Sequence, residues 1–253
     1  MKEIVSARGL TKRYQLGKNN YVDALRGVTM GVKGGEMVAI MGPSGCGKST
    51  LLHILGCLDS PDGGEVWLND RRIDNLGSRA VTKLLREEIG FIFQGFNLVP
   101  SMSALDNVAL SAHYAGKSRR EAQRVAEKAL DGVGLADRYA HRPNELSGGQ
   151  QQRVAIARAL VNEPLMILGD EPTGNLDSTS SSEVIRMMRD INLATGTIFI
   201  LVTHDADVAE ACDRVVHMRD GLVALRDGLV APDDTSTGAR AEPAVCGRIM
   251  RAV

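Results

Sequence analysis

Apolar runs of strand length alternate with helical patterns along much of the chain. Two segments carry apolar residues at helical spacing, 51–55 and 178–194, the latter with Val184, Ile185, Met188 and Ile191 on one face. Four short runs are almost entirely apolar and predict buried strands: 36–41, 89–93, 165–171 and 197–203. This alternation is typical of an α/β fold whose sheet is covered on both faces.

The two ends of this α/β pattern look different. Residues 3–14 and 21–32 read as two strands around the turn-rich segment 17–20, which predicts an antiparallel β subdomain at the N-terminus. Residues 214–218 predict the last ordered element, and the similar pentapeptides 219–223 and 226–230 suggest a small hairpin. Residues 231–253 show no apolar periodicity, and we expect a mobile tail there.

A helical block interrupts the alternation between residues 100 and 161. Ser118 and Glu121 form a capping-box pattern, and apolar residues follow at helix-face spacing. Such a block predicts a subdomain inserted into the α/β core. In front of it, residues 96–102 are unusually apolar for a loop, which indicates either a docking surface for another protein or packing under the helices.

Composition narrows the class of protein. Of the 253 residues 43% are hydrophobic and 24% charged, as in ordinary globular proteins, and the net charge of −1 offers no attraction to nucleic acid or anionic lipid. The four cysteines lack metal-site spacing and suit free thiols in a reducing compartment. We expect neither a signal peptide nor a membrane span, because no apolar run is long enough.

Residues 42–50 fit a motif that consists of a glycine, four arbitrary residues, and then Gly-Lys-Ser/Thr. They are Gly42, Pro43, Ser44, Gly45, Cys46, Gly47, Lys48, Ser49 and Thr50. The glycines let successive backbone N–H groups point at one anion, and the helix N-terminus adds its dipole. Lys48 supplies a charge for the β- and γ-phosphates, and the Ser49 hydroxyl can ligate Mg²⁺. Because a predicted strand precedes the motif and a predicted helix follows it, nucleotide binding is favoured over a simple glycine-rich turn.

Three of the buried strands end in residues that can act on a phosphate. Asp170 can hold Mg²⁺, and Glu171 can orient and deprotonate the water that attacks the γ-phosphate. His204 can hydrogen-bond the γ-phosphate or hold that water. Gln94 can reach the metal or the water, or it caps a loop.

Two features allow two interpretations each when taken alone. Ser147, Gly148, Gly149 and Gln150 open a predicted helix and form either a second anion site or an ordinary N-cap. Tyr14 can stack on a purine, or it is a half-buried strand tyrosine.

Taken together, these motifs resemble the ATP-binding cassette of ABC proteins, in that family's order. The resemblance covers about residues 1–223 and implies a P-loop NTPase core with an inserted helical subdomain at about 97–162, followed by an extension over 224–253. Residues 146–150 match the signature that separates this family from other P-loop proteins. The cofactors implied are ATP and Mg²⁺.

The resemblance also implies a role for each motif. Residues 42–50 would bind the phosphates, and Tyr14 would stack on adenine. Asp170 and Glu171 would serve metal and water, Gln94 would sense nucleotide and partner, and His204 would be the switch histidine. In the family two cassettes lie head to tail, so that Ser147 and Gly149 of one face the γ-phosphate held by the other, with Asp177 at the seam between them. ATP cleavage would then weaken the pair.

Residues 21–25, 96–100 and 174–178 are similar to the branch that includes macrolide exporters, lipoprotein-releasing ATPases and a cell-division ATPase. This branch implies an integral membrane permease as partner and a peripheral place on the cytoplasmic face of the membrane. Gly169 departs from the family, where alanine is common before the paired acids, and we expect little effect on the chemistry.

Four other functions compete with an exporter ATPase. A cell-division-type transenvelope regulator shares every motif, so the sequence does not separate it from an exporter. An ABC protein acting on nucleic acid would show a second cassette, a coiled-coil insertion or zinc-type cysteine pairs, and this sequence has none of them. A small-molecule kinase gives no reason for residues 146–150, and a non-hydrolysing sensor would not keep both Glu171 and His204.

Overall fold

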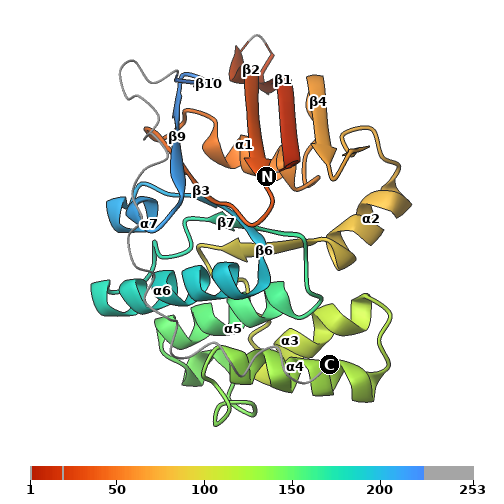
Figure 1. Ribbon diagram of the computed structural model, residues 1–253, viewed down its shortest axis with the longest axis vertical. Helices are drawn as coiled ribbons and strands as arrows, with labels where there is room; N and C mark the ends of the chain where they lie inside the picture. Colours follow the sequence, from red (N-terminus) through yellow and green to blue (C-terminus); the bar gives the residue numbers. More distant parts are fainter. Residues whose placement is uncertain (1, 19, 225–253) are drawn as a thin grey trace.

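The computed structural model describes residues 2–18 and 20–224, and its strands form two sheets (Figure 1). The antiparallel sheet has the order β2-β1-β4-β5. It consists of β1 (Glu3–Gly17), β2 (Asn20–Lys33), β4 (Gly63–Leu68) and β5 (Arg71–Arg72). The predicted N-terminal antiparallel subdomain is therefore confirmed, and β1 and β2 meet at the predicted turn.

The second sheet has the order β10-β9-β3-β8-β7-β6. Its parallel strands are β3 (Met37–Met41), β6 (Ile89–Phe93), β7 (Met166–Asp170), β8 (Ile198–Val202) and β9 (Arg214–Arg219). The short β10 (Leu222–Val223) pairs antiparallel with β9 at the edge, so that residues 219–223 contain the turn and second strand of a β9–β10 hairpin. The predicted pairing of 219–223 with 226–230 is not tested by the described residues. The matching pentapeptide 226–230 and most of the expected mobile extension lie outside the described residues.

The parallel sheet lies between two apolar cores, which explains its continuous apolar strands. Along β8, Ile198, Ile200 and Val202 belong to the core shared with the antiparallel sheet and α1 (Lys48–Leu55). Phe199 and Leu201 point the other way, into the core shared with the helices. One strand thus joins both halves of the molecule.

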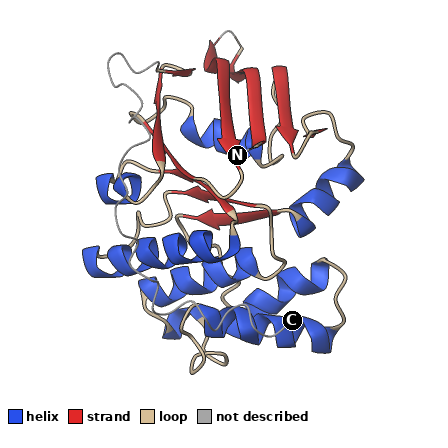
Figure 2. Ribbon diagram, in the orientation of Figure 1, coloured by secondary structure: helices blue, strands red, loops and turns tan. Residues whose placement is uncertain are grey.

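Helices cover the second face of this sheet (Figures 1 and 2). The predicted helical block contains α3 (Ala104–Tyr114), α4 (Arg119–Gly132), the 3₁₀ turn η1 (Pro143–Glu145) and α5 (Gly148–Leu160), and α6 (Ser178–Thr195) follows β7. Ser118 caps α4 by accepting a hydrogen bond from the Glu121 N–H. Within residues 2–18 and 20–224, no helix combines the length and apolar character that a membrane span requires.

Two short helices were not predicted, α2 (Ser78–Glu87) and α7 (Ala206–Glu210). Helix α2 does carry a short apolar stripe, because Val81, Leu84 and Leu85 lie at helical spacing and Leu84 is buried. Its signal was present in the sequence, but the sequence analysis did not single it out. Helix α7 has five residues, which is too few for helical spacing to be visible.

Candidate functional site

The polar residues predicted from the strand ends do meet at one edge of the parallel sheet. Parallel strands place their carboxyl ends together, and Gly42, Gln94, Glu171 and His204 follow β3, β6, β7 and β8 closely. Because β3 lies between β8 and β9, the phosphate loop leaves the middle of the sheet. Asp170 and Glu171 lie at the end of β7, which is two strands away from β3 in the sheet.

Glycine is required at two positions of the phosphate loop. Gly47, the N-cap of α1, has φ 100°, and a Cβ there would lie 2.2 Å from the Ala24 carbonyl oxygen. A Cβ at Gly42 would lie 2.2 Å from the Met218 carbonyl oxygen. Any side chain at these positions would push the loop away from β2 or β9.

Lys48 lies inside the curve of the phosphate loop and is 9% exposed. Its Nζ donates to the carbonyl oxygens of Gly42 and Pro43, at 2.9 Å each. A cation held this way beside the start of α1 is placed to meet an anion that the loop's N–H groups bind.

Ser49 and Asp170 bring two oxygen donors together. The Ser49 hydroxyl donates to Asp170 Oδ1 at 3.1 Å. A hydroxyl and a carboxylate are ligands that Mg²⁺ accepts when phosphate and water oxygens complete its shell. The described residues contain no group of three or more His, Cys, Asp or Glu that could hold a metal unaided, so this pair would need such additional oxygens.

Glu171 and His204 form the acid–base pair of this edge. His204 Nδ1 lies 3.0 Å from Glu171 Oε2, and the histidine is 71% exposed while the glutamate is 24% exposed. Glu171 has φ 48°, an uncommon backbone conformation for a residue with a side chain, and its N–H donates to the Val202 carbonyl. The strained backbone therefore directs one carboxylate toward the open edge of the sheet.

A cavity of about 410 Å³ brings most of the predicted residues together. It is lined by Tyr14, Val22, Ala24, Gly42, Ser44, Gly45, Gly47, Lys48, Ser49, Thr50, Glu171 and His204. Pro43 and Cys46 belong to the loop without lining this cavity, and the Cys46 side chain is buried in the core.

Tyr14 is fixed by two residues that the sequence analysis did not single out, Lys12 and Asp59. The Tyr14 hydroxyl donates to Asp59 Oδ2 at 2.6 Å, and Lys12 Nζ donates to Asp59 Oδ1 at 2.8 Å. Lys12 Nζ also lies 5.3 Å from the centre of the Tyr14 ring. Burial, followed by the hydrogen bond to Asp59, raises the pKa of Tyr14. The tyrosine is thus half-buried in its strand, as one interpretation predicted, and it also lines the cavity. Stacking on a purine stays a prediction.

Gln94 lies beside this cavity and does not line it. The Asn175 side chain donates to the Gln94 carbonyl oxygen at 2.8 Å, and Gln94 Nε2 lies 3.5 Å from Asn175 Oδ1. A Cβ at Gly174 would touch both Gln94 Nε2 and Glu171 Oε2, at 2.8 and 3.2 Å. The glutamine is therefore close to the glutamate, through the turn that follows β7.

The segment 147–150 forms a second group, away from the phosphate cavity. Ser147 caps α5 in a full capping box with Gln150, as the N-cap interpretation predicted. A Cβ at Gly149 would lie 3.0 Å from Ser180 Oγ, so α5 and α6 begin side by side. Asp177 caps α6, and hydrogen bonds from Ser180 lower the pKa of its carboxyl. These groups and the phosphate loop do not share the cavity within one chain.

Comparison with known proteins places this geometry in a family. Residues 25–174 match the model of the ABC transporter family. The chain belongs to this family. It is an ABC ATPase with the expected ABC ATPase fold and an ATP-binding site, which excludes the kinase and non-hydrolysing sensor alternatives.

Three ABC relatives show how far the similarity extends. An uncharacterized ABC transporter ATP-binding protein of Thermotoga maritima is 48% identical over 221 residues, which are 87% of this chain and 94% of that protein. The macrolide export ATP-binding/permease protein MacB of Bdellovibrio bacteriovorus is 48% identical over 221 residues, and the match spans a third (33%) of it. A dimeric post-hydrolysis structure of the cassette MJ0796, from Methanocaldococcus jannaschii, bound to ADP and Pi, has TM-score 0.82 and 42% identity, and covers 90% of this chain and 100% of that one.

Proposed function

We propose that two copies of this chain close head to tail around ATP, and that cleavage of the γ-phosphate opens them. The observation that carries the proposal is the separation of Ser147, Gly149 and Asp177 from the phosphate cavity of the same chain. A head-to-tail pair would bring the group at the start of α5 to the phosphate loop of the other copy. The dimeric structure of MJ0796 with ADP and Pi supports this arrangement.

Each site residue then has a role that suits its position. The loop 42–50 binds the phosphates, with Lys48 on the β- and γ-phosphates, and Tyr14 stacks on the base. Glu171 accepts the proton of the attacking water, and His204, 3.0 Å from it, orients the carboxylate and the water. Gln94 contributes through its contact with the turn at Asn175.

The donor pair Ser49 and Asp170 fits Mg²⁺, with Gln94 as a further candidate ligand at the same edge. When bound, the ion would neutralise charge on the β- and γ-phosphate oxygens. The buried Lys48 and the N–H groups of the loop would share that work.

We further propose that the ATPase, residues 1–223, powers a membrane exporter or transenvelope complex of the MacB/LolD type. In MacB-type relatives the sequence matching this chain is joined to a permease, as their printed name states. A permease as a separate partner would hold this chain at the cytoplasmic face of the membrane. A regulator of cell-division type would share that place without moving a solute, and the membrane protein that co-purifies with the chain distinguishes the two.

Glu171→Gln tests the proposal directly. The amide cannot accept the proton, so hydrolysis should stop while ATP binding persists, and light scattering should show a stable dimer in saturating Mg-ATP. Glu127→Gln, on the exposed face of α4, is the matched control and should hydrolyse ATP normally. A Glu171→Gln chain that stays single under these conditions would contradict the head-to-tail closure.

A further inference from the structure

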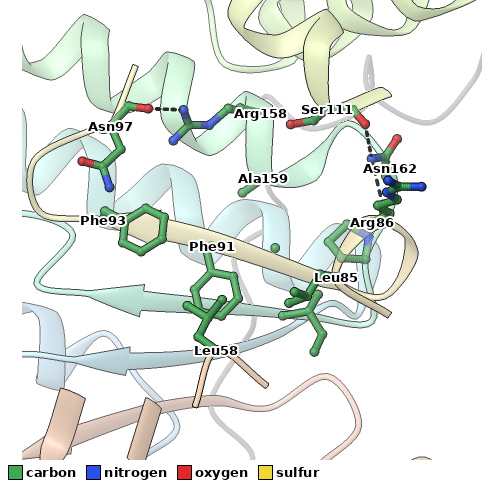
Figure 3. A pocket seen from close by; sticks show the side chains of 13 residues that line it. Leu58, Leu85, Arg86, Phe91, Phe93, Asn97, Ser111, Arg158, Ala159 and Asn162 are labelled. Atoms are coloured by element: carbon green, nitrogen blue, oxygen red, sulfur yellow. Dashed lines mark hydrogen bonds between the residues drawn. The ribbon is translucent and has the colours of Figure 1, made fainter. Parts of the chain in front are cut away.

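A groove of about 290 Å³ is lined by residues of β6 and of helices α2, α3 and α5 (Figure 3). Its lining includes Phe91, Phe93, Asn97, Arg158 and Asn162. On one side of it the Arg158 side chain, from α5, reaches the loop that follows β6. We name residues 94–97 the Gln94 loop.

The Gln94 loop is held in a strained conformation. Phe96 and Asn97 are consecutive residues with φ 59° and 49°, the left-handed region that side chains disfavour. Two tight backbone bonds accompany this bend, from the Asn97 N–H to the Gly95 carbonyl at 2.6 Å and from the Phe96 N–H to the Phe93 carbonyl at 3.2 Å. Two adjacent residues of this kind persist only where the surroundings hold them.

Arg158 stabilises this conformation by hydrogen bonds to both residues. Its guanidinium donates from Nη2 to the Phe96 carbonyl oxygen at 2.8 Å, and from Nη1 to the Asn97 carbonyl oxygen. Thus the backbone carbonyl oxygens of both left-handed residues accept hydrogen bonds from the same side chain. The planar guanidinium donates to these two acceptors from two separate nitrogens in fixed directions, whereas a lysine would have to reach both carbonyls from a single nitrogen.

Arg158 depends on the loop in return. Burial lowers the pKa of its guanidinium, which remains charged, and no ion pair of Arg158 is found among residues 2–18 and 20–224. The two carbonyl dipoles therefore compensate a partly buried charge. Moving the loop away would leave that charge without partners, so helix and loop favour one shared arrangement.

Helix α5 carries Arg158 near its C-terminal end. Its N-terminal end carries Ser147 and Gly149, which we place at the nucleotide bound by the other copy. Helix α5 begins at the Ser147 cap and packs closely on β6, where a Cβ at Gly90 would lie 2.6 Å from the Ala159 carbonyl oxygen. The rigid helix thus connects Ser147 to the backbone next to Gln94.

We propose that Arg158 is a positioning residue for ATP hydrolysis: it holds the Gln94 loop in its strained conformation and makes that loop follow α5. The inference rests on the proposed function, because it takes Gln94 and Ser147 to act on nucleotide. Movement of α5 toward or away from the other copy would then shift Gln94 relative to Glu171. Arg158 itself does not line the phosphate cavity.

A double-mutant cycle on the full chain tests this role of Arg158. We call the two hydrogen bonds from Arg158 to the Gln94 loop the latch. Arg158→Met keeps the side chain's length and removes both hydrogen bonds. Without them, the energetic cost of one left-handed residue should reduce the population of the active loop conformation roughly tenfold, and kcat for ATP should fall by the same factor. KM should change by less than about twofold. Asn97→Gly removes most of the strain at its position, because glycine adopts the left-handed region freely. Alone it should leave kcat within about twofold of the unaltered chain, and in the Arg158→Met background it should recover most of the lost kcat.

Three results would overturn the inference. They are an unchanged kcat in Arg158→Met, a loss that Asn97→Gly fails to recover, and full activity in Arg158→Lys, which keeps the charge but not the fork. Arg158→Lys also keeps the test open if the methionine variant folds poorly, because an intermediate kcat is expected for it. Gln94→Ala, measured in parallel, reports on the proposed function: full turnover there contradicts the role of Gln94, whereas loss there with full turnover in Arg158→Met contradicts only the latch.

Discussion

Tyr14 shows how much a single side chain depends on its neighbours. Its ring lines the phosphate cavity, and its hydroxyl is tied to Asp59, which Lys12 also holds. Hydrogen bonds to the carboxylate lower the pKa of Asp59 although burial opposes this, so the anchor is charged at neutral pH. Residues of this chain thereby fix the orientation of the ring.

Tyr14→Phe separates the ring from its anchor. We expect ATP to bind about threefold to tenfold more weakly, because a hydrogen bond to a charged group fixes the ring's orientation. Asp59→Asn should give a similar loss, and the double variant should lose no more than either single one. Calorimetric titration with ATP measures this, and Tyr114→Phe, an exposed tyrosine on α3, should bind ATP as the unaltered chain does.

A second prediction at this scale concerns Asp213 and pH. Burial opposes ionisation of this carboxyl, but hydrogen bonds from Arg189 and the Met37 N–H outweigh it, so its pKa lies below the ordinary value. A lowered pKa contributes to the free energy of unfolding above the ordinary aspartate pKa, and that contribution is lost as pH falls through the lowered value.

Asp213→Asn should therefore reduce the free energy of unfolding by about 1 kcal/mol near pH 7, since the pair is partly exposed and solvent screens it. The difference from the unaltered chain should shrink below about pH 4. Urea titrations across this range measure it. Asp137→Asn, 70% exposed, should show almost no change, and an equal loss there would refute the explanation.

At the scale of elements, the close contact between β6 and α5 depends on the absence of a side chain at Gly90. Gly90→Ala should lower the free energy of unfolding by about 1–3 kcal/mol, because its methyl group would press on rigid backbone. Thermal or urea unfolding measures this. Gly17→Ala is the matched control, since no atom lies within 4 Å of the added carbon, and there we expect a change under about 0.5 kcal/mol.

The elements that the sequence predicts well are those whose pattern is local. The four apolar strands, the phosphate loop and the capped helices carry their signals within a few neighbouring residues. Helix α2 was missed although Val81, Leu84 and Leu85 lie at helical spacing, because this stripe is only three residues long, and α7 was missed because it is too short. Asp59 and Arg158 were missed for another reason: their partners lie 45 and 62 residues away, so only the folded chain shows what they bind.

At the scale of the whole molecule, head-to-tail pairing predicts complementation between two inactive chains. Lys48→Ala removes the phosphate-loop charge, and Gly148→Asp puts a carboxylate at the α5 start, where a Cβ meets only ordinary contacts. In a mixed pair both changes fall on one of the two sites, and the other stays intact. An equal mixture should regain about a quarter of normal ATPase activity in a phosphate-release assay, if the sites act independently. A mixture as inactive as its components would argue against shared sites.

The position of β3 in the sheet has a consequence for how the protein is made. The phosphate loop follows β3, whose two neighbours, β8 and β9, are the last long strands of the described chain. The turn at Gly221 also donates its N–H to the Cys46 carbonyl. A ribosome that has finished residue 50 must therefore translate almost the whole cassette before this strand gains either companion. Nascent chains would contain the complete phosphate-loop motif for most of their synthesis without a folded nucleotide pocket. Tight ATP binding would begin only when β8 and β9 have been synthesised and have paired with β3.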